Sequence, residues 1–129
     1  MSPPTFHMIP GAPTPVAPFS HAVEMDGWLF VTGQMPTWPE DDAKASPEGI
    51  EAQTRACIEN VKAILEDAGS ALERVVDVTV FLTDIDRDFA AFNRVYGEFF
   101  EAIRPTRTTV GVVALPVPIS IELKVIAEG

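Results

Sequence analysis

Residues 49–69, GIEAQTRACIENVKAILEDAG, give the clearest indication of the fold. Ser46 and Pro47, just upstream, are a candidate N-cap and first-turn proline, and Gly69 stands where a glycine commonly follows a helix end. The stretch is therefore predicted to be an amphipathic helix that buries its only cysteine as a small apolar residue. Its predicted buried face repeats at helical spacing: Ile50, Thr54, Cys57, Ile58, Val61, Ile64, Leu65 and Ala68.

On the C-terminal side, residues 74–84, RVVDVTVFLTD, form a β-branched run that predicts a central strand. A second helix should begin at Asp86 or Asp88 and end before Pro105. Two further strands are predicted, over about 106–113 and 119–127. The apolar face of the second helix is aromatic: Phe89, Phe92, Tyr96, Phe99 and Phe100.

On the N-terminal side, residues 20–34, SHAVEMDGWLFVTGQ, predict a hairpin, because Asp26-Gly27 is a strong signal for a two-residue turn. A loop rich in proline and acid follows. Six of the twelve prolines fall within residues 1–18. Their fixed φ and missing N–H donors predict an extended, irregular N-terminal segment rather than a regular element.

The predicted order is β-β-α-β-α-β-β in one α+β domain over residues 1–129. Two helices cover only one face of such a sheet, so the other face must meet water or another subunit. Val, Ile and Leu of the last two strands are expected there. They would form a large apolar patch, which predicts self-association.

Composition excludes several classes of function. The mean hydropathy of +0.15 and 47% hydrophobic residues are globular values, and no apolar stretch is as long as a membrane span. Nineteen acidic residues against nine basic ones oppose nucleic-acid binding, which depends on Lys and Arg. With Cys57 alone no internal disulfide can form, as expected of a cytoplasmic protein.

Two charges interrupt the apolar strands near the C-terminus. Arg107 begins one predicted strand, where a guanidinium could bind a carboxylate with two hydrogen bonds, or could simply be a surface residue of an edge strand. Glu122 lies between Ile121 and Leu123 and is either used or paired with Lys124 or Arg107. The threonines around Arg107 could complete an anion site.

Other chemistries have little support. His7 and His21 lack a ligand pattern, so no metal site is predicted, and no nucleotide-binding glycine motif or nucleophile elbow occurs. No hydrolase triad is apparent.

Several stretches together resemble the reactive intermediate deaminase (RidA) family, also called endoribonuclease L-PSP. They include PFSHAV, LFVTGQMP, VVDVTVFLTDI, FAAFNRVYGEFF and PTRTTV…LP…IELKVIA, and the match runs from about Pro18 to Ala127. The resemblance implies a chorismate-mutase-like fold with two helices on one face of the sheet. It also implies a homotrimeric barrel with clefts between subunits. The implied reaction is hydrolysis of enamines or imines such as 2-aminoacrylate, without metal or organic cofactor.

The resemblance also assigns residues. Arg107 would bind the substrate carboxylate and Glu122 would position water, with Thr32, Gly33, Asn93 and Thr109 completing the site. Phe19 stands where the family usually has tyrosine, so a hydroxyl is missing. That departure keeps open a non-catalytic or differently specific carboxylate binder, and a catabolic enzyme acting on an aminomuconate-like or aminoacrylate peracid intermediate. An endoribonuclease is opposed by the charge. The loop from Pro36 to Pro47 departs most from the family pattern.

Overall fold

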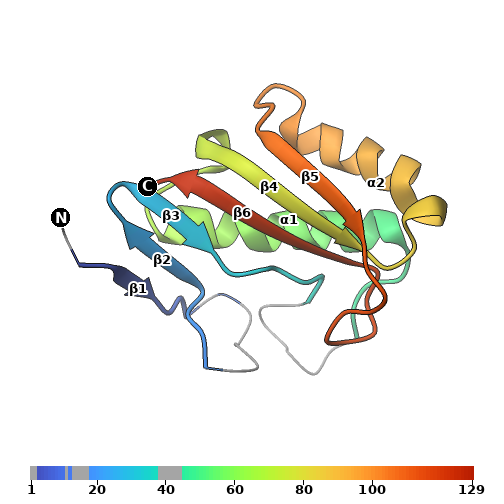
Figure 1. Cartoon of the computed structure of the whole chain (residues 1–129), viewed down its shortest axis with the longest axis horizontal. Helices are drawn as coiled ribbons and strands as arrows, with labels where there is room; N and C mark the ends of the chain where they lie inside the picture. The colour runs from blue at the N-terminus through green and yellow to red at the C-terminus, as the bar shows by residue number, and fades with distance from the viewer. Residues whose placement is uncertain (1–2, 11, 13–17, 38–44) are drawn as a thin grey trace.

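The computed structural model describes residues 3–10, 12, 18–37 and 45–129. Within them, two α-helices pack on one face of a six-stranded mixed sheet, whose order is β1-β2-β3-β6-β4-β5 (Figure 1). Neighbouring strands are antiparallel except β4 and β5, which are parallel. The predicted α+β class and order are confirmed, with one more strand at the N-terminus. The elements are β1 (Thr5–His7), β2 (Ala22–Met25), β3 (Trp28–Val31), α1 (Ile50–Asp67), β4 (Val75–Leu82), α2 (Ile85–Phe100), β5 (Thr106–Gly111) and β6 (Ile121–Glu128).

The N-terminal segment contains that extra strand. Thr5–His7 pair with β2 at the edge of the sheet, so the prediction that residues 1–18 hold no regular element is wrong there. An edge strand needs backbone donors on one side only, and these three residues lie between Pro4 and Pro10. Residues 1–2, 11 and 13–17 lie outside the described part, as does most of the loop from Pro36 to Pro47.

Turn and cap residues explain where the elements begin and end. Asp26 and Gly27 have φ of 51° and 84°, as a type I′ turn requires, which confirms the hairpin. Gly69, with φ of 85°, follows α1 as predicted. The predicted N-cap Ser46 is wrong, because Gly49 directly precedes α1. The second helix begins at Ile85, one residue before the predicted Asp86, and Asp84 caps it by accepting a hydrogen bond from the Arg87 N–H. Asp84, Asp86 and Asp88 are equally good cap residues by type, so only the backbone conformation shows which of them caps α2.

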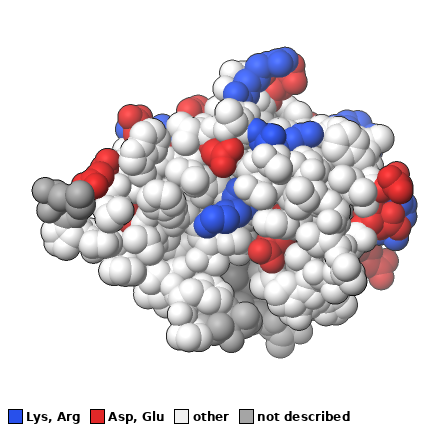
Figure 2. Space-filling model, viewed as in Figure 1, with Lys and Arg blue, Asp and Glu red and all other residues white. Residues whose placement is uncertain are grey.

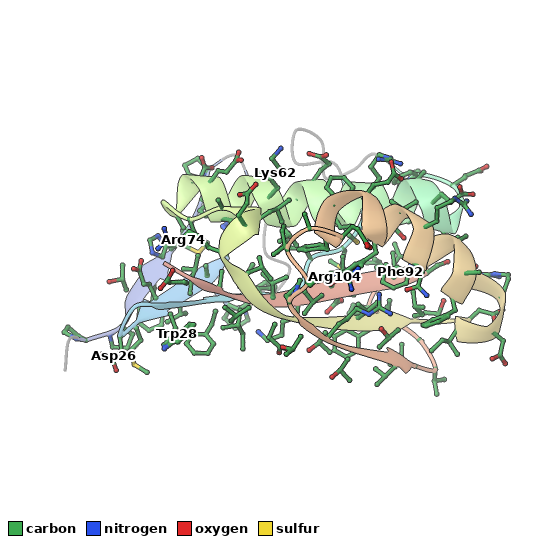
Figure 3. The ribbon with its side chains drawn as sticks, turned by 90° about the horizontal axis from the view of Figure 1, so that it is seen from above. Asp26, Trp28, Lys62, Arg74, Phe92 and Arg104 are labelled. Carbon is green, nitrogen blue, oxygen red and sulfur yellow. The ribbon has the colours of Figure 1, made fainter. Side chains whose placement is uncertain are left out.

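The core lies between the helices and the sheet. Cys57 is fully buried on α1, as predicted, and Phe92 fills the space between α2 and the sheet (Figure 3). β6 alternates strictly, with its apolar side toward the helices: Ile121, Leu123, Val125 and Ala127. None of the helices in the described part is long and apolar enough to cross a membrane.

The face of the sheet away from the helices is called the open face here. The prediction that the last two strands make it apolar is wrong for most of β6, whose alternation leaves Glu122, Lys124 and Glu128 there beside the apolar Ile126. Its large exposed apolar residues include Phe6, Met25, Trp28, Phe30 and Val110. Figure 2 views this face, which is mostly uncharged, and Figure 3 shows Trp28 on the side opposite the helices.

Candidate functional site

Arg107 lies on the edge strand β5, with its side chain covered by α2. It pairs with Val78 of β4, so both point to the helix side of the sheet. The guanidinium carbon is 4.8 Å from the ring centre of Tyr96, 5.2 Å from that of Phe92 and 5.9 Å from that of Phe89. The structure therefore excludes a freely solvated surface arginine.

The guanidinium of Arg107 has no anionic partner within the described part of the chain. No ion pair or hydrogen bond to it occurs there, although the residue is half-buried. Aromatic faces attract a cation but leave its five N–H donors unused. A guanidinium held in this way is suited to bind a carboxylate through two hydrogen bonds.

A pocket opens beside this arginine. Its volume is about 370 Å³, within the range of small-molecule sites, and it lies between α2, the α2–β5 connection and β5. It brings Asn93 together with Arg107, as the family resemblance implies. Its lining consists of Asn93, Tyr96, Gly97, Phe100, Glu101, Arg104, Pro105 and Arg107.

Two buried hydroxyls lie on the same side of the sheet. Thr109 is two residues after Arg107 on β5 and therefore projects to the same face. Its Oγ1 and the Tyr96 hydroxyl are buried without a hydrogen-bond partner in the described residues. Burial raises the pKa of Tyr96, Asp77 raises it further and Arg107 lowers it, so the phenol stays protonated at neutral pH. Unsatisfied buried polar groups are rare and costly.

Glu122 lies on the open face, opposite to the side occupied by Arg107. It pairs with Phe81 on β4. Phe81 precedes Leu82, which faces the helices, so Phe81 and Glu122 both face away from them. Burial raises the pKa of Glu122 and Lys124 lowers it less. Neither predicted ion pair forms: the Lys124 ammonium donates to the Val31 carbonyl at 3.1 Å, and no described residue forms a salt bridge with Glu122.

Gly33 lies against Glu122, and the adjacent Thr32 contacts the segment that contains Phe19. A Cβ at Gly33 would overlap the Glu122 carboxylate and lie 3.0 Å from its Cδ, so only glycine leaves that carboxylate undisturbed. The Thr32 hydroxyl donates to the Ser20 carbonyl at 2.6 Å, which ties the segment containing Phe19 to β3. The Phe19 side chain is 41% exposed.

The predicted site residues thus form two groups in one chain. The arginine half-site consists of Arg107, Asn93 and Thr109 on the helix side. The glutamate half-site consists of Glu122 and Gly33, and the hydrogen bond of the adjacent Thr32 joins the segment containing Phe19 to it. The structure does not bring the Arg107 and Glu122 side chains together within one chain, because they project from opposite faces.

Sequence reasoning missed two participants. Tyr96 was predicted only as part of an apolar helix face, yet its ring covers Arg107. Arg104 was not predicted, although it lines the pocket. Its positive φ of 56° is not visible in sequence, since a residue before proline usually adopts an extended conformation. No group of three or more potential metal ligands occurs among the described residues.

The fold and the two half-sites define a small α+β protein whose pocket contains a cation that is unpaired among the described residues. The family model described as Endoribonuclease L-PSP matches residues 10–129. A RutC family protein of Pyrococcus abyssi is 45% identical over 116 residues, covering 90% of each chain. The chain therefore belongs to the endoribonuclease L-PSP family, which its relatives' names also call RutC and RidA.

Solved structures of relatives have the same fold. RidA from an Antarctic Psychrobacter species is 34% identical, with a TM-score of 0.89 over 97% of this chain and 99% of its own. TdcF of E. coli, solved with bound serine, is also 34% identical, with a TM-score of 0.89 over 97% of this chain and 98% of its own. Both cover nearly the whole chain, so the likeness includes both half-sites.

Proposed function

We propose that the protein hydrolyses carboxylate-bearing enamines and imines of the 2-aminoacrylate type to 2-oxo acids and ammonia. The observation that carries this proposal is the half-buried Arg107 guanidinium, which is unpaired among the described residues and lines a pocket. Family membership supports it. The serine bound to TdcF supports it too, since serine presents the same carboxylate beside nitrogen as these substrates.

The chemistry needs water as the only co-reactant. The enamine gains a proton at carbon and loses one at nitrogen to become an imine. Water adds across the C=N bond, the C–N bond breaks with proton transfer to nitrogen, and ammonia leaves a C=O group. In this proposal Arg107 orients the carboxylate and Glu122 takes a proton from the attacking water. A raised pKa brings Glu122 closer to the value that suits a base at neutral pH, and such a base contributes about 10²–10⁴-fold.

The two half-sites require a second chain to meet. We propose a homotrimer in which the arginine half-site of one subunit faces the glutamate half-site of its neighbour. An apolar row supports association: Phe6, Val23, Phe30 and Ile126 are cross-strand partners on the open face. A head-to-tail contact of this kind closes into a ring.

Subunit complementation tests the proposal. Arg107→Ala and Glu122→Gln should each reduce release of 2-oxo acid from 2-aminoacrylate generated in situ to near background. After the two variants are mixed, unfolded and refolded together, about one site in four would combine an intact Arg107 with an intact Glu122 across a cyclic interface. Activity of about a quarter of wild type is therefore expected.

Separately refolded variants are the control for that experiment. An active Arg107→Ala protein would refute the assigned role of the arginine. A mixture that stays inactive while its subunits exchange would refute the shared site.

A non-catalytic or differently specific carboxylate binder is the second candidate, because Phe19 supplies no hydroxyl. Keto-acid release measured for several amino-acid-derived imines, with an aminomuconate-like substrate included, distinguishes the candidates, since a pure binder gives background turnover. RNA cleavage is opposed by the net charge of −10.

A further inference from the structure

The pocket beside Arg107 has a second cation, Arg104. Both arginines line the same cavity of about 370 Å³, one from the connection after α2 and the other from β5. Figure 3 shows Arg104 in that connection. Such a volume falls in the range of about 300–1,000 Å³ that holds drug-sized ligands, so a three-carbon substrate would leave much of it empty.

Arg104 adopts a backbone conformation that arginine rarely takes. Its φ is 56°, in the left-handed region where glycine is favoured after a helix end. Its N–H donates to the Phe100 carbonyl at 2.9 Å, which closes the last turn of α2. Glycine would close that turn without strain, so the closure alone does not explain an arginine here.

The side chain of Arg104 retains donors for a ligand. Its Nε donates to the Glu101 carbonyl at 3.0 Å and its Nη2 to the Glu101 carboxylate at 2.5 Å, while the side chain remains 75% exposed. Because a guanidinium carries five N–H donors, the remaining ones are free to reach an anion.

The charge of the pocket differs in sign from that of the protein. Its charged lining residues are Arg104, Arg107 and Glu101, which leaves one net positive charge in a chain of net charge −10. A cationic pocket in an acidic protein attracts anions locally.

We propose that Arg104 binds a second, distal anionic group, so that the pocket prefers dicarboxylic 2-imino acids over monocarboxylic ones. Arg107 takes the carboxylate beside the reacting carbon, and Arg104 takes the one at the far end of the chain. The inference rests on the proposed function for the reaction, but the binding preference rests on the two arginines alone.

Binding of unreactive acids to the full-length protein tests the preference. Succinate, glutarate and adipate are compared at low salt with monocarboxylates of the same chain length, butyrate, valerate and hexanoate, by calorimetric or NMR titration. One exposed charge pair adds up to about fivefold in affinity, so the best-fitting dicarboxylate should bind about fivefold more tightly than its partner. In Arg104→Gly, which removes the side chain but suits the positive φ, the preference should vanish, because dicarboxylate affinity should fall more than monocarboxylate affinity.

Two further variants complete the experiment. Glu101→Gln removes the competing carboxylate and should increase the preference, while Arg107→Ala should weaken binding of both kinds of acid. Equal affinity for both members of every pair, or a preference that survives Arg104→Gly, would overturn the inference. Monocarboxylate binding that is insensitive to Arg107→Ala would instead count against the proposed function, which is a distinguishable result.

Discussion

The Glu122 carboxylate is the proposed base, and its burial lowers the stability of the folded protein at neutral pH. Burial raises its pKa above the ordinary value of 4.5, which means that folding favours the protonated form. Its contribution to stability is fully present below the pKa of the unfolded chain and is lost as pH rises through the pKa of the folded protein. At neutral pH the ionised Glu122 therefore destabilises the fold in which the proposed reaction would use it as a base.

Glu122→Gln should consequently stabilise the protein at neutral pH while removing activity. Glutamine has the same shape and no charge to desolvate, so the midpoint of thermal unfolding should exceed that of wild type at pH 7–8. The two midpoints should converge near pH 4, where the wild-type carboxyl is protonated. Thermal unfolding at both pH values and one protein concentration checks this, and a lower midpoint for the variant at pH 7 would contradict it.

Gly33→Ala should impair catalysis more than folding. The new methyl would overlap the Glu122 carboxylate, which is the end of a flexible side chain and moves aside at little cost. Stability should change by less than about 1 kcal/mol, whereas a base displaced by about 1 Å costs up to about 100-fold in rate. Measured kcat and denaturant midpoints test both parts.

The Glu122→Gln background is the control for Gly33→Ala. There the added methyl should reduce the remaining rate little further, because the group that it displaces is already absent. Full activity of the single variant would show that Gly33 has no role in positioning the carboxylate.

At the scale of elements, α2 is held in place by its cap. Asp84 accepts a hydrogen bond from the Arg87 N–H at 3.2 Å. Asp84→Ala should therefore lower the free energy of unfolding by about 1 kcal/mol, or a midpoint of thermal unfolding by about 4 °C. Asp86→Ala is the matched control: it removes the same charge from an exposed site of the first turn and should cost less. Equal losses would show that the helix dipole matters and the cap does not.

The sequence indicates the faces of these elements better than their ends. Helical spacing correctly predicted the burial of Phe92, Tyr96 and Phe100 on α2, because that face is set by local periodicity, but Phe89 is 39% exposed. It did not indicate that this face covers Arg107. That contact joins residues eleven or more positions apart and depends on how the helix packs against the strand. Likewise, Arg107 and Glu122 stand out in sequence as misplaced charges, but their opposite directions follow only from strand register.

At the scale of the whole molecule, the open face should mediate association. Phe30 is 39% exposed at the centre of its apolar row, away from the core. Phe30→Glu should therefore yield monomers with an unchanged circular dichroism spectrum and no turnover, as measured by light scattering and keto-acid release. Ala52→Glu, which adds the same charge on the exposed side of α1, should leave the oligomer intact. An oligomer that survives Phe30→Glu would exclude this face as the interface.

The number of layers followed from the sequence, but the surface of the open face did not. Two helices and a set of strands were enough to predict one covered sheet face. Most of the apolar residues on the other face were assigned to the wrong strands, because a run such as Ile119–Ala127 looks apolar throughout until its alternation is fixed by pairing with β4. The exposed aromatic residues instead come from the hairpin, where Trp28 and Phe30 alternate with buried Leu29 and Val31.

Because β4 and β5 are parallel, the residues that line the pocket and the residue Glu122 lie on different elements, which can change independently. A parallel pair needs a crossover, and here the crossover is α2, so the helix that connects the strands is also the lid over the cation. Substitutions at the pocket-lining positions Asn93, Gly97 and Glu101 would change the shape of the pocket without disturbing β6, which carries the proposed base Glu122. Relatives with this fold could therefore change their substrate specificity while keeping the same reaction.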